Sequence, residues 1–191
     1  MNTGAASAPM SGPAAGWLPA ARQVRSPNCD ARPAGCVIDL IVIHAISLPP
    51  AEFGGPYVEQ LFTNTLDTGA HAYFAQLRGL RVSAHFLLTR VAQLTQFVDI
   101  HQRAWHAGES HWEGRARCND FSIGIELEGC DDMPFTAVQY AALTELLATL
   151  MHLLPALTPA RIVGHSDIAP RRKTDPGPHF DWARVRRSVA R

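Results

Sequence analysis

The sequence predicts an α/β or α+β fold built on a single β-sheet, and three segments support this prediction. Residues 36–44 are apolar on both alternating faces, which is typical of a central strand buried on both sides. Residues 122–128 alternate between polar and apolar side chains, as a half-buried strand does. Residues 136–154 carry apolar side chains such as Val138 and Leu146 at helical spacing up to Pro155, so they predict a helix.

Shorter segments complete the predicted order of elements. Residues 59–67 are expected to contain a short helix, and residues 161–165 indicate a short strand that ends in a histidine. Residues 83–88 and 94–98 are spaced as the two strands of a hairpin. Residues 103–120 show no periodicity and are expected to form a long surface loop, which in a compact domain is usually functional.

The composition indicates a globular protein and excludes several classes of partner. The chain has 191 residues, and its 17 Lys and Arg balance its 17 Asp and Glu, so the formal net charge is zero. Proteins that bind nucleic acids usually carry a positive total charge, so we expect no nucleic-acid partner. The hydrophobic share of 47% and the charged share of 18% argue against disorder. No apolar run reaches the roughly 18 residues of a membrane-spanning helix, so we expect no membrane partner.

The two ends of the chain differ in composition from its middle. Residues 1–35 hold five Pro and four Gly among nine Ala, and we expect them to form a poorly ordered leader that packs on the domain without building its core. The domain itself is predicted to span residues 36–182, and residues 183–191 to form a basic C-terminal tail, a helix at best. The first 20 residues contain no Lys or Arg and lack the form of a secretory signal, so the cytoplasm is the expected compartment. The cysteines lack metal-site spacing and are expected to be free thiols: Cys29, Cys36, Cys118 and Cys130.

Two of the nine histidines occupy positions that favour a metal site. His44 and His165 each end an apolar strand where the chain becomes a loop, and such strand ends commonly expose ligands to a shared crevice. Two imidazoles and one carboxylate form a common catalytic zinc set. Asp175 could supply the carboxylate, but Asp167 competes for that role and would suit a helix N-cap equally well. By contrast, His85 lies inside a predicted strand and is expected to be a hydrogen-bonded core histidine.

Glu126 and Lys173 are the candidate catalytic groups. Glu126 points to the same side of its strand as Ser122 and Gly124, so this face is either solvated or lines a cleft with room for a substrate. A Glu beside a zinc site is the usual general base of hydrolytic zinc enzymes. Lys173 is the single lysine beside 16 arginines, which raises the question of what a compact ammonium does there that a guanidinium cannot.

Several long motifs resemble the AmpD branch of the zinc N-acetylmuramoyl-L-alanine amidases, over about residues 17–182. The runs that carry the resemblance are 47–56, 81–85, 104–108, 118–129, 164–170 and 173–178. The resemblance implies a mixed central sheet flanked by helices, as also found in peptidoglycan recognition proteins. It further implies hydrolysis of the amide between the lactyl group of N-acetylmuramic acid and L-alanine. In this branch the substrates are 1,6-anhydro-muropeptides, cleaved in the cytoplasm during peptidoglycan recycling.

The resemblance also assigns roles to individual residues. It makes His44, His165 and Asp175 the ligands of one zinc ion per chain and leaves Asp167 a structural role. Glu126 becomes the general base, and Lys173 the cation at the developing oxyanion.

Residues that contact the muropeptide substrate follow from the same resemblance. Arg81 and Arg117 are implied to meet carboxylates of the stem peptide, with Ala169 near them, although each arginine could equally form a surface ion pair. Trp105 and His106 are implied to line the cleft. The expected assembly is a monomer.

The sequence departs from the family pattern at two points. Ala45 follows His44 where the branch typically has Asn, and the hairpin at residues 89–94 lacks the Asp-Gly turn common in relatives.

Three rival functions are compared with the amidase. A non-catalytic muropeptide-binding module would lack a zinc ligand, whereas Asp175 is present. A secreted wall-lytic amidase would carry a signal or a wall-binding repeat, and a gene regulator would carry a helix-turn-helix; the sequence indicates none of these.

Overall fold

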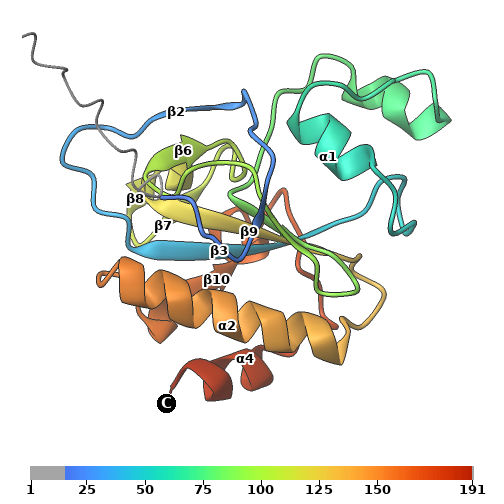
Figure 1. Cartoon of the computed structure of the whole chain (residues 1–191). Helices are drawn as coiled ribbons and strands as arrows, with labels where there is room; N and C mark the ends of the chain where they lie inside the picture. The colour runs from blue at the N-terminus through green and yellow to red at the C-terminus, as the bar shows by residue number, and fades with distance from the viewer. Residues whose placement is uncertain (1–15, 191) are drawn as a thin grey trace, which may run out of the picture.

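The structure, a computed structural model, describes residues 16–190, and its centre is a six-stranded mixed sheet (Figure 1). The spatial order of the strands is β1 (Arg22–Gln23), β5 (Leu94–Gln96), β4 (Phe86–Leu88), β9 (Ser122–Glu128), β3 (Leu40–Ile46) and β10 (Ile162–Gly164). The pair β4–β5 is antiparallel, and the other neighbouring strands are parallel. The predicted mixed central sheet and the predicted hairpin are therefore confirmed, and residues 16–190 also form two further two-stranded sheets.

Helix α2 (Ala137–Leu153) covers one face of this sheet, and α4 (Trp182–Val189) packs against α2 (Figure 1). The side chains of β3 that face α2, Ile41 and Ile43, belong to the larger core together with Leu143 and Leu147 of α2. The other face of β3, with Leu40 and Val42, packs in a second cluster. The prediction of a strand buried on both sides is confirmed, and His44 follows Leu40 and Val42 on the face opposite α2.

The long helix begins as the sequence predicts, and Leu146 is buried as predicted, but the first position of the predicted apolar stripe is exposed. The Thr136 side chain accepts a hydrogen bond from the Gln139 amide, and the Gln139 side chain accepts one from the Thr136 amide, which forms a capping box. Val138, expected in the apolar stripe, is 51% exposed. Tyr140 and Gln139 are buried instead. The side chain of Gln139 can be buried because it donates a hydrogen bond to the carbonyl of Glu128.

The segment 103–120 is not simply a surface loop, which corrects the prediction. It contains the end of β6 (Gln102–Ala104), the hairpin β7 (His111–Trp112) and β8 (Arg115–Ala116), and the short 3-10 helix η2 (Cys118–Asp120). Ala104, Ala107 and Cys118 are fully buried. These strands are only two or three residues long, too short to produce a periodic pattern in the sequence.

The remaining helices, apart from α2 and α4, are short. The predicted short helix is α1 (Tyr57–Phe62), and it ends before residue 67. The shorter helices are α3 (His165–Ile168), η1 (Ala72–Leu77) and η3 (Pro159–Arg161). No helix among residues 16–190 is long and apolar enough to cross a membrane. All four cysteines are free thiols, as predicted.

The N-terminal segment contributes to the core, contrary to the expectation for residues 16–35. Leu18 and Ala21 are buried in the main cluster, and the Leu18 amide donates to Gln96 Oε1 at 2.8 Å. This segment also supplies β1 and β2 (Cys29–Ala31), the latter paired with β6. Residues 1–15 of the expected leader lie outside the described residues. Because this segment is rich in Pro and Gly, the sequence did not indicate that single apolar side chains within it are buried in the core.

The C-terminal helix likewise belongs to the core, although it was expected to be a tail. Val185 and Val189 of α4 are buried in the main cluster, and the guanidinium of Arg184 lies 4.8 Å from the centre of the Tyr140 ring. Because this stretch is rich in arginine, the sequence did not indicate that one side of the helix is apolar and buried.

Truncating Leu18 tests the contribution of the N-terminal segment. Leu18→Ala is expected to lower the free energy of unfolding by about 2–5 kcal/mol, the usual cost of a cavity at a buried leucine. Leu153→Ala, at a position that is 47% exposed, should change it by no more than about 0.5 kcal/mol. Urea unfolding of both variants measures the difference. Equal values would show that residues 16–21 fray without cost to the fold.

Candidate active site

Two neighbouring parallel strands bring the two candidate histidines together. His44 is near the C-terminal end of β3, and His165 follows β10 directly as the first residue of α3. Gly164 pairs with Ile43, so His165 lies beside His44 at the same edge of the sheet. The predicted strand ends are confirmed, and both side chains are buried.

His44, His165 and Asp175 form a compact triad of polar atoms. The Nδ1 atoms of the two histidines are 2.9 Å apart, and Asp175 Oδ2 lies 3.2 Å from that of His44 and 3.1 Å from that of His165. Burial lowers the pKa of His44 to about 4 despite the neighbouring carboxylate of Asp175. Burial alone would raise the pKa of Asp175, but its contacts with His165 and His44 hold it below the usual range. Both groups are thus in the forms that ligate metals, a neutral imidazole and a carboxylate.

The donor set of this triad fits a metal ion. His165 Nε2 lies 3.2 Å from the carbonyl oxygen of Ala107, which can only accept, so Nε2 carries the proton and Nδ1 presents a lone pair to Asp175. Acceptor atoms that face one another repel unless a cation lies between them. Two nitrogens and one carboxylate oxygen suit zinc. Within residues 16–190 this is the one group of His, Cys, Asp or Glu side chains arranged to hold a metal.

Asp167, the competing carboxylate, has a different role. Its Oδ2 accepts a hydrogen bond of 2.7 Å from the Gly164 amide at the start of α3. It therefore caps the short helix that begins with His165, which agrees with the structural role that the resemblance implied.

Glu126 lies in the same cleft as the triad, and its carboxylate is buried. The cleft has a volume of about 610 Å³ and is bordered by the triad, Glu126 and Lys173. Glu126 pairs in register with His44 across β9 and β3, it is 8% exposed, and its Oε2 atom has no hydrogen-bond partner among the described residues. Burial, and then the charge of Asp175, raise the pKa of Glu126 well above its usual value, while Lys173 opposes the shift. The alternative of a solvated strand face is wrong.

Glu128 shares the strand face with Glu126 but is used elsewhere. Its carboxylate accepts hydrogen bonds from the backbone amides of Gly54 and Arg90, at 2.5 and 2.9 Å. It borders a separate hollow of about 320 Å³. The structure therefore distinguishes two carboxylates that strand parity alone could not separate.

The residues implied to contact the stem peptide are not gathered in this cleft. Arg117 is ion-paired to Asp120 at 2.6 Å, as its alternative interpretation anticipated. Arg81 borders a small hollow of about 110 Å³, and Ala169 borders another of about 560 Å³. Their contacts with a substrate remain predictions.

Trp105 and His106 do border the cleft, but His106 is tied to the triad. His106 Nδ1 lies 2.9 Å from Nε2 of His44, and burial lowers the pKa of His106 well below its usual value. Ala45 also borders the cleft, where a polar residue is typical of the branch. His85 is a fully buried core histidine, as predicted, and its Nδ1 accepts from the Gly124 amide.

One wall of the cleft was not found from the sequence. It is apolar and comes from α1, η1 and the segment that follows: Leu61, Phe62, Tyr73, Leu77, Leu80 and Val82. Apolar side chains are common in cores as well as in clefts, so nothing in the sequence marked these residues as functional.

Comparisons with known proteins agree with this geometry. Residues 34–178 match the family described as N-acetylmuramoyl-L-alanine amidase. The chain is 53% identical over 178 residues to the 1,6-anhydro-N-acetylmuramyl-L-alanine amidase AmpD of Salmonella typhimurium, with 93% of this chain and 95% of that protein covered. The Escherichia coli AmpD is 52% identical over 176 residues, covering 92% and 96%.

Solved structures lead to the same family. A crystal structure of AmpD superposes with a TM-score of 0.89 at 53% identity, covering 92% of this chain and 97% of that one. The Escherichia coli amidase AmiD, in complex with the substrate anhydro-N-acetylmuramic acid-L-Ala-D-γ-Glu-L-Lys, has a TM-score of 0.60 at 30% identity. That match covers 82% of this chain and 60% of AmiD.

Proposed function

Because the chain belongs to the N-acetylmuramoyl-L-alanine amidase family, we propose that it is a zinc hydrolase that cleaves the amide between the lactyl group of N-acetylmuramic acid and L-alanine. The substrates we propose are 1,6-anhydro-muropeptides, in keeping with the names of the relatives that match nearly the whole chain. The proposed setting is peptidoglycan recycling in the cytoplasm, with the protein acting as a monomer. The observation that carries the proposal is that one cleft holds both the buried triad and the Glu126 carboxylate, whose Oε2 atom has no hydrogen-bond partner among residues 16–190.

His44, His165 and Asp175 would hold the zinc ion. When bound, zinc supplies a Lewis acid that polarises a carbonyl and lowers the pKa of a coordinated water toward about 7. The carboxylate of Asp175 would balance part of the charge of the ion, and the lowered pKa of His44 keeps that buried imidazole neutral, as a ligand must be.

Glu126 is the proton carrier of the reaction. Its raised pKa makes it a stronger base than an exposed glutamate, and such a group works best with a pKa near the operating pH. It takes a proton from the attacking water as the water adds to the lactyl carbonyl. It then returns that proton to the nitrogen of L-alanine, so that the C–N bond breaks and a free amine leaves.

Lys173 stabilises the negative charge that develops on the carbonyl oxygen. It borders the cleft, and its charge influences both Glu126 and His44. Its amide donates to the carbonyl of Ala169 at 3.0 Å, which fixes the backbone at this point. An ammonium placed where charge appears only in the transition state lowers the barrier without tightening substrate binding.

Removing this ammonium should therefore affect turnover more than binding. Lys173→Ala is expected to lower kcat and kcat/KM together by about 10² to 10³. Lys173→Arg keeps the charge but changes its reach and shape, so it should also be impaired. Arg171→Ala, at an exposed position outside the cleft lining, is the control and should match the parent. Steady-state kinetics measures all three, and a Lys173→Arg variant as fast as the parent would leave the lone lysine without a catalytic role.

The substrate assignment is tested by comparing two substrates. A 1,6-anhydro-muropeptide should be hydrolysed much faster than intact peptidoglycan, with release of a peptide that begins with L-alanine. Binding without cleavage would indicate a muropeptide-binding module, and preference for intact wall would indicate a wall-lytic amidase. Either result would overturn the proposed substrate class.

A further inference from the structure

A line of three hydrogen bonds leads from His44 away from the triad to a backbone carbonyl. His44 Nε2 lies 2.9 Å from His106 Nδ1, and His106 Nε2 lies 3.1 Å from the hydroxyl oxygen of Ser122. That hydroxyl lies 2.6 Å from the carbonyl oxygen of Cys118. His44, His106 and Ser122 are each 9% exposed or less. These buried polar groups therefore meet their hydrogen-bonding needs by bonding to one another.

The carbonyl at the end of this line determines which atom donates the proton in each of the three hydrogen bonds. The Cys118 carbonyl can only accept, so Ser122 must donate its hydroxyl proton to it. The Ser122 oxygen then accepts from His106, which places the His106 proton on Nε2 and leaves Nδ1 as an acceptor. His106 Nδ1 must in turn accept from His44 Nε2–H. The Nδ1 atom of His44 is left with a lone pair directed at Asp175 and His165.

We propose that His106 is a positioning residue that fixes the tautomer and ring orientation of His44. The Ser122 hydroxyl and the Cys118 carbonyl in turn hold the His106 ring in place. This inference rests on the proposed zinc site and deepens it. It replaces the substrate contact that the resemblance implied for His106 with a contact to a metal ligand. Partners of this kind, which hold the second nitrogen of a ligating histidine, raise metal affinity because the ligand is already oriented.

The same short segment orients the second histidine. The carbonyl of Ala107, the next residue, accepts from His165 Nε2 at 3.2 Å. The amides of His106 and Ala107 both donate to Asn119 Oδ1, at 3.1 and 2.8 Å. Residues 106–107 thus hold both imidazoles with Nδ1 toward the triad, one through a side chain and one through a carbonyl.

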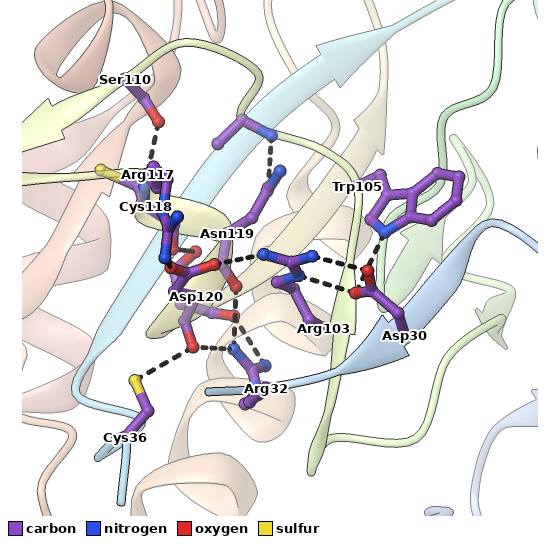
Figure 2. A network of polar contacts seen from close by, with 12 residues as sticks. Asp30, Arg32, Cys36, Arg103, Trp105, Ser110, Arg117, Cys118, Asn119 and Asp120 are labelled. Atoms are coloured by element: carbon purple, nitrogen blue, oxygen red, sulfur yellow. Dashed lines mark hydrogen bonds and ion pairs between the residues drawn. The ribbon is translucent and has the colours of Figure 1, made fainter. Parts of the chain in front are cut away.

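Ion pairs anchor the chain just before this segment (Figure 2). The guanidinium of Arg103 bridges Asp30 of β2 and Asp120 of η2, with N–O distances of 2.5 to 2.6 Å. Trp105 Nε1 also donates to Asp30 at 3.2 Å. The N-terminal segment thereby helps to fix the backbone that leads to His106.

Gly124 of β9 leaves the space that the His106 ring occupies. A Cβ atom at position 124 would lie 2.4 Å from Cγ of His106, too close for both to stay in place. Gly124→Ala is thus expected to displace the ring without removing any hydrogen-bonding group.

The first test observes the tautomers directly. Long-range ¹H–¹⁵N correlation spectra of the zinc-loaded protein should show His106 protonated at Nε2 and unprotonated at Nδ1. A His106 ring protonated at Nδ1, or exchanging between tautomers, would overturn the proposal. This measurement uses the unaltered protein, so it does not depend on any variant folding.

The second test measures zinc affinity by competition with a chromophoric chelator. His106→Leu, which keeps bulk but removes the acceptor, should weaken zinc binding by about 10- to 100-fold, and Gly124→Ala should weaken it in the same direction. His106→Asn, which keeps an acceptor close to the Nδ1 position, should recover part of the loss. His152→Asn, at an exposed position on α2, is the matched control and should bind as the parent does.

The outcomes separate this inference from the proposed function. If the parent binds no zinc, the proposed metal site itself fails. If the parent binds zinc and folded His106→Leu binds it equally well, only the positioning role of His106 fails.

Discussion

Asp175→Ala is expected to abolish zinc binding and hydrolysis together. Its carboxylate is the single negative charge in the triad and lies within 3.2 Å of both histidine Nδ1 atoms. Without it, two neutral imidazoles would have to hold a divalent cation in a largely buried site, where an uncompensated charge is costly. Elemental analysis of the purified variant should find background zinc, and no hydrolysis should be measurable.

Asp167→Asn provides the matched control for this loss. The amide of asparagine keeps an oxygen that can accept from Gly164, so the cap of α3 is retained while the charge is removed. This variant should keep its zinc and its activity. Loss of zinc from Asp167→Asn and its retention in Asp175→Ala would mean that the wrong carboxylate has been placed in the triad.

Glu126→Gln is expected to keep zinc while lowering kcat by about 10² to 10⁴, the usual contribution of a positioned proton-transfer group. Glutamine has the same shape but cannot carry the proton from the water to the amine. Glu126 is not a member of the triad, so metal content should not change. Zinc analysis and turnover measured on the same preparation separate the two effects.

Glu128→Gln is the control for Glu126, because the two residues share a strand face and differ only in surroundings. Glutamine at 128 can still accept a hydrogen bond from the amide of Gly54 or Arg90. We expect nearly parental kcat with slightly lower stability. A large loss of kcat in Glu128→Gln beside a mild effect of Glu126→Gln would contradict the assigned roles.

The regular elements of the fold were predictable because their patterns are long. The seven-residue strands β3 and β9 and the capped helix α2 each contain enough residues for a period to be visible. The strands of two or three residues, such as β1 and β7, are defined by tertiary pairing and leave no such pattern. Leu18 and Val185 were not expected in the core for a different reason, because Leu18 lies in a segment rich in Pro and Gly and Val185 lies among arginines.

The candidate site was only partly accessible from the sequence. The strand ends predicted His44 and His165, but Asp175 could be preferred over Asp167 only through the family resemblance. The link from His44 through His106 to Ser122 joins residues that are 62 and 16 positions apart, so only the folded chain shows it. The different roles of Glu126 and Glu128 also follow from the different contacts that each carboxylate makes in the folded chain.

The most direct test of the central claim is mass spectrometry of a 1,6-anhydro-N-acetylmuramoyl tripeptide incubated with the zinc-loaded protein, with and without a chelator. The proposed reaction predicts two products: the anhydro sugar with a free lactyl carboxylate, and a tripeptide with a free L-alanine amine. The two masses should sum to the substrate plus one water, and neither product should form when the metal has been removed. Substrate that stays intact with zinc bound, or products that form equally well in the chelated sample, would contradict the account.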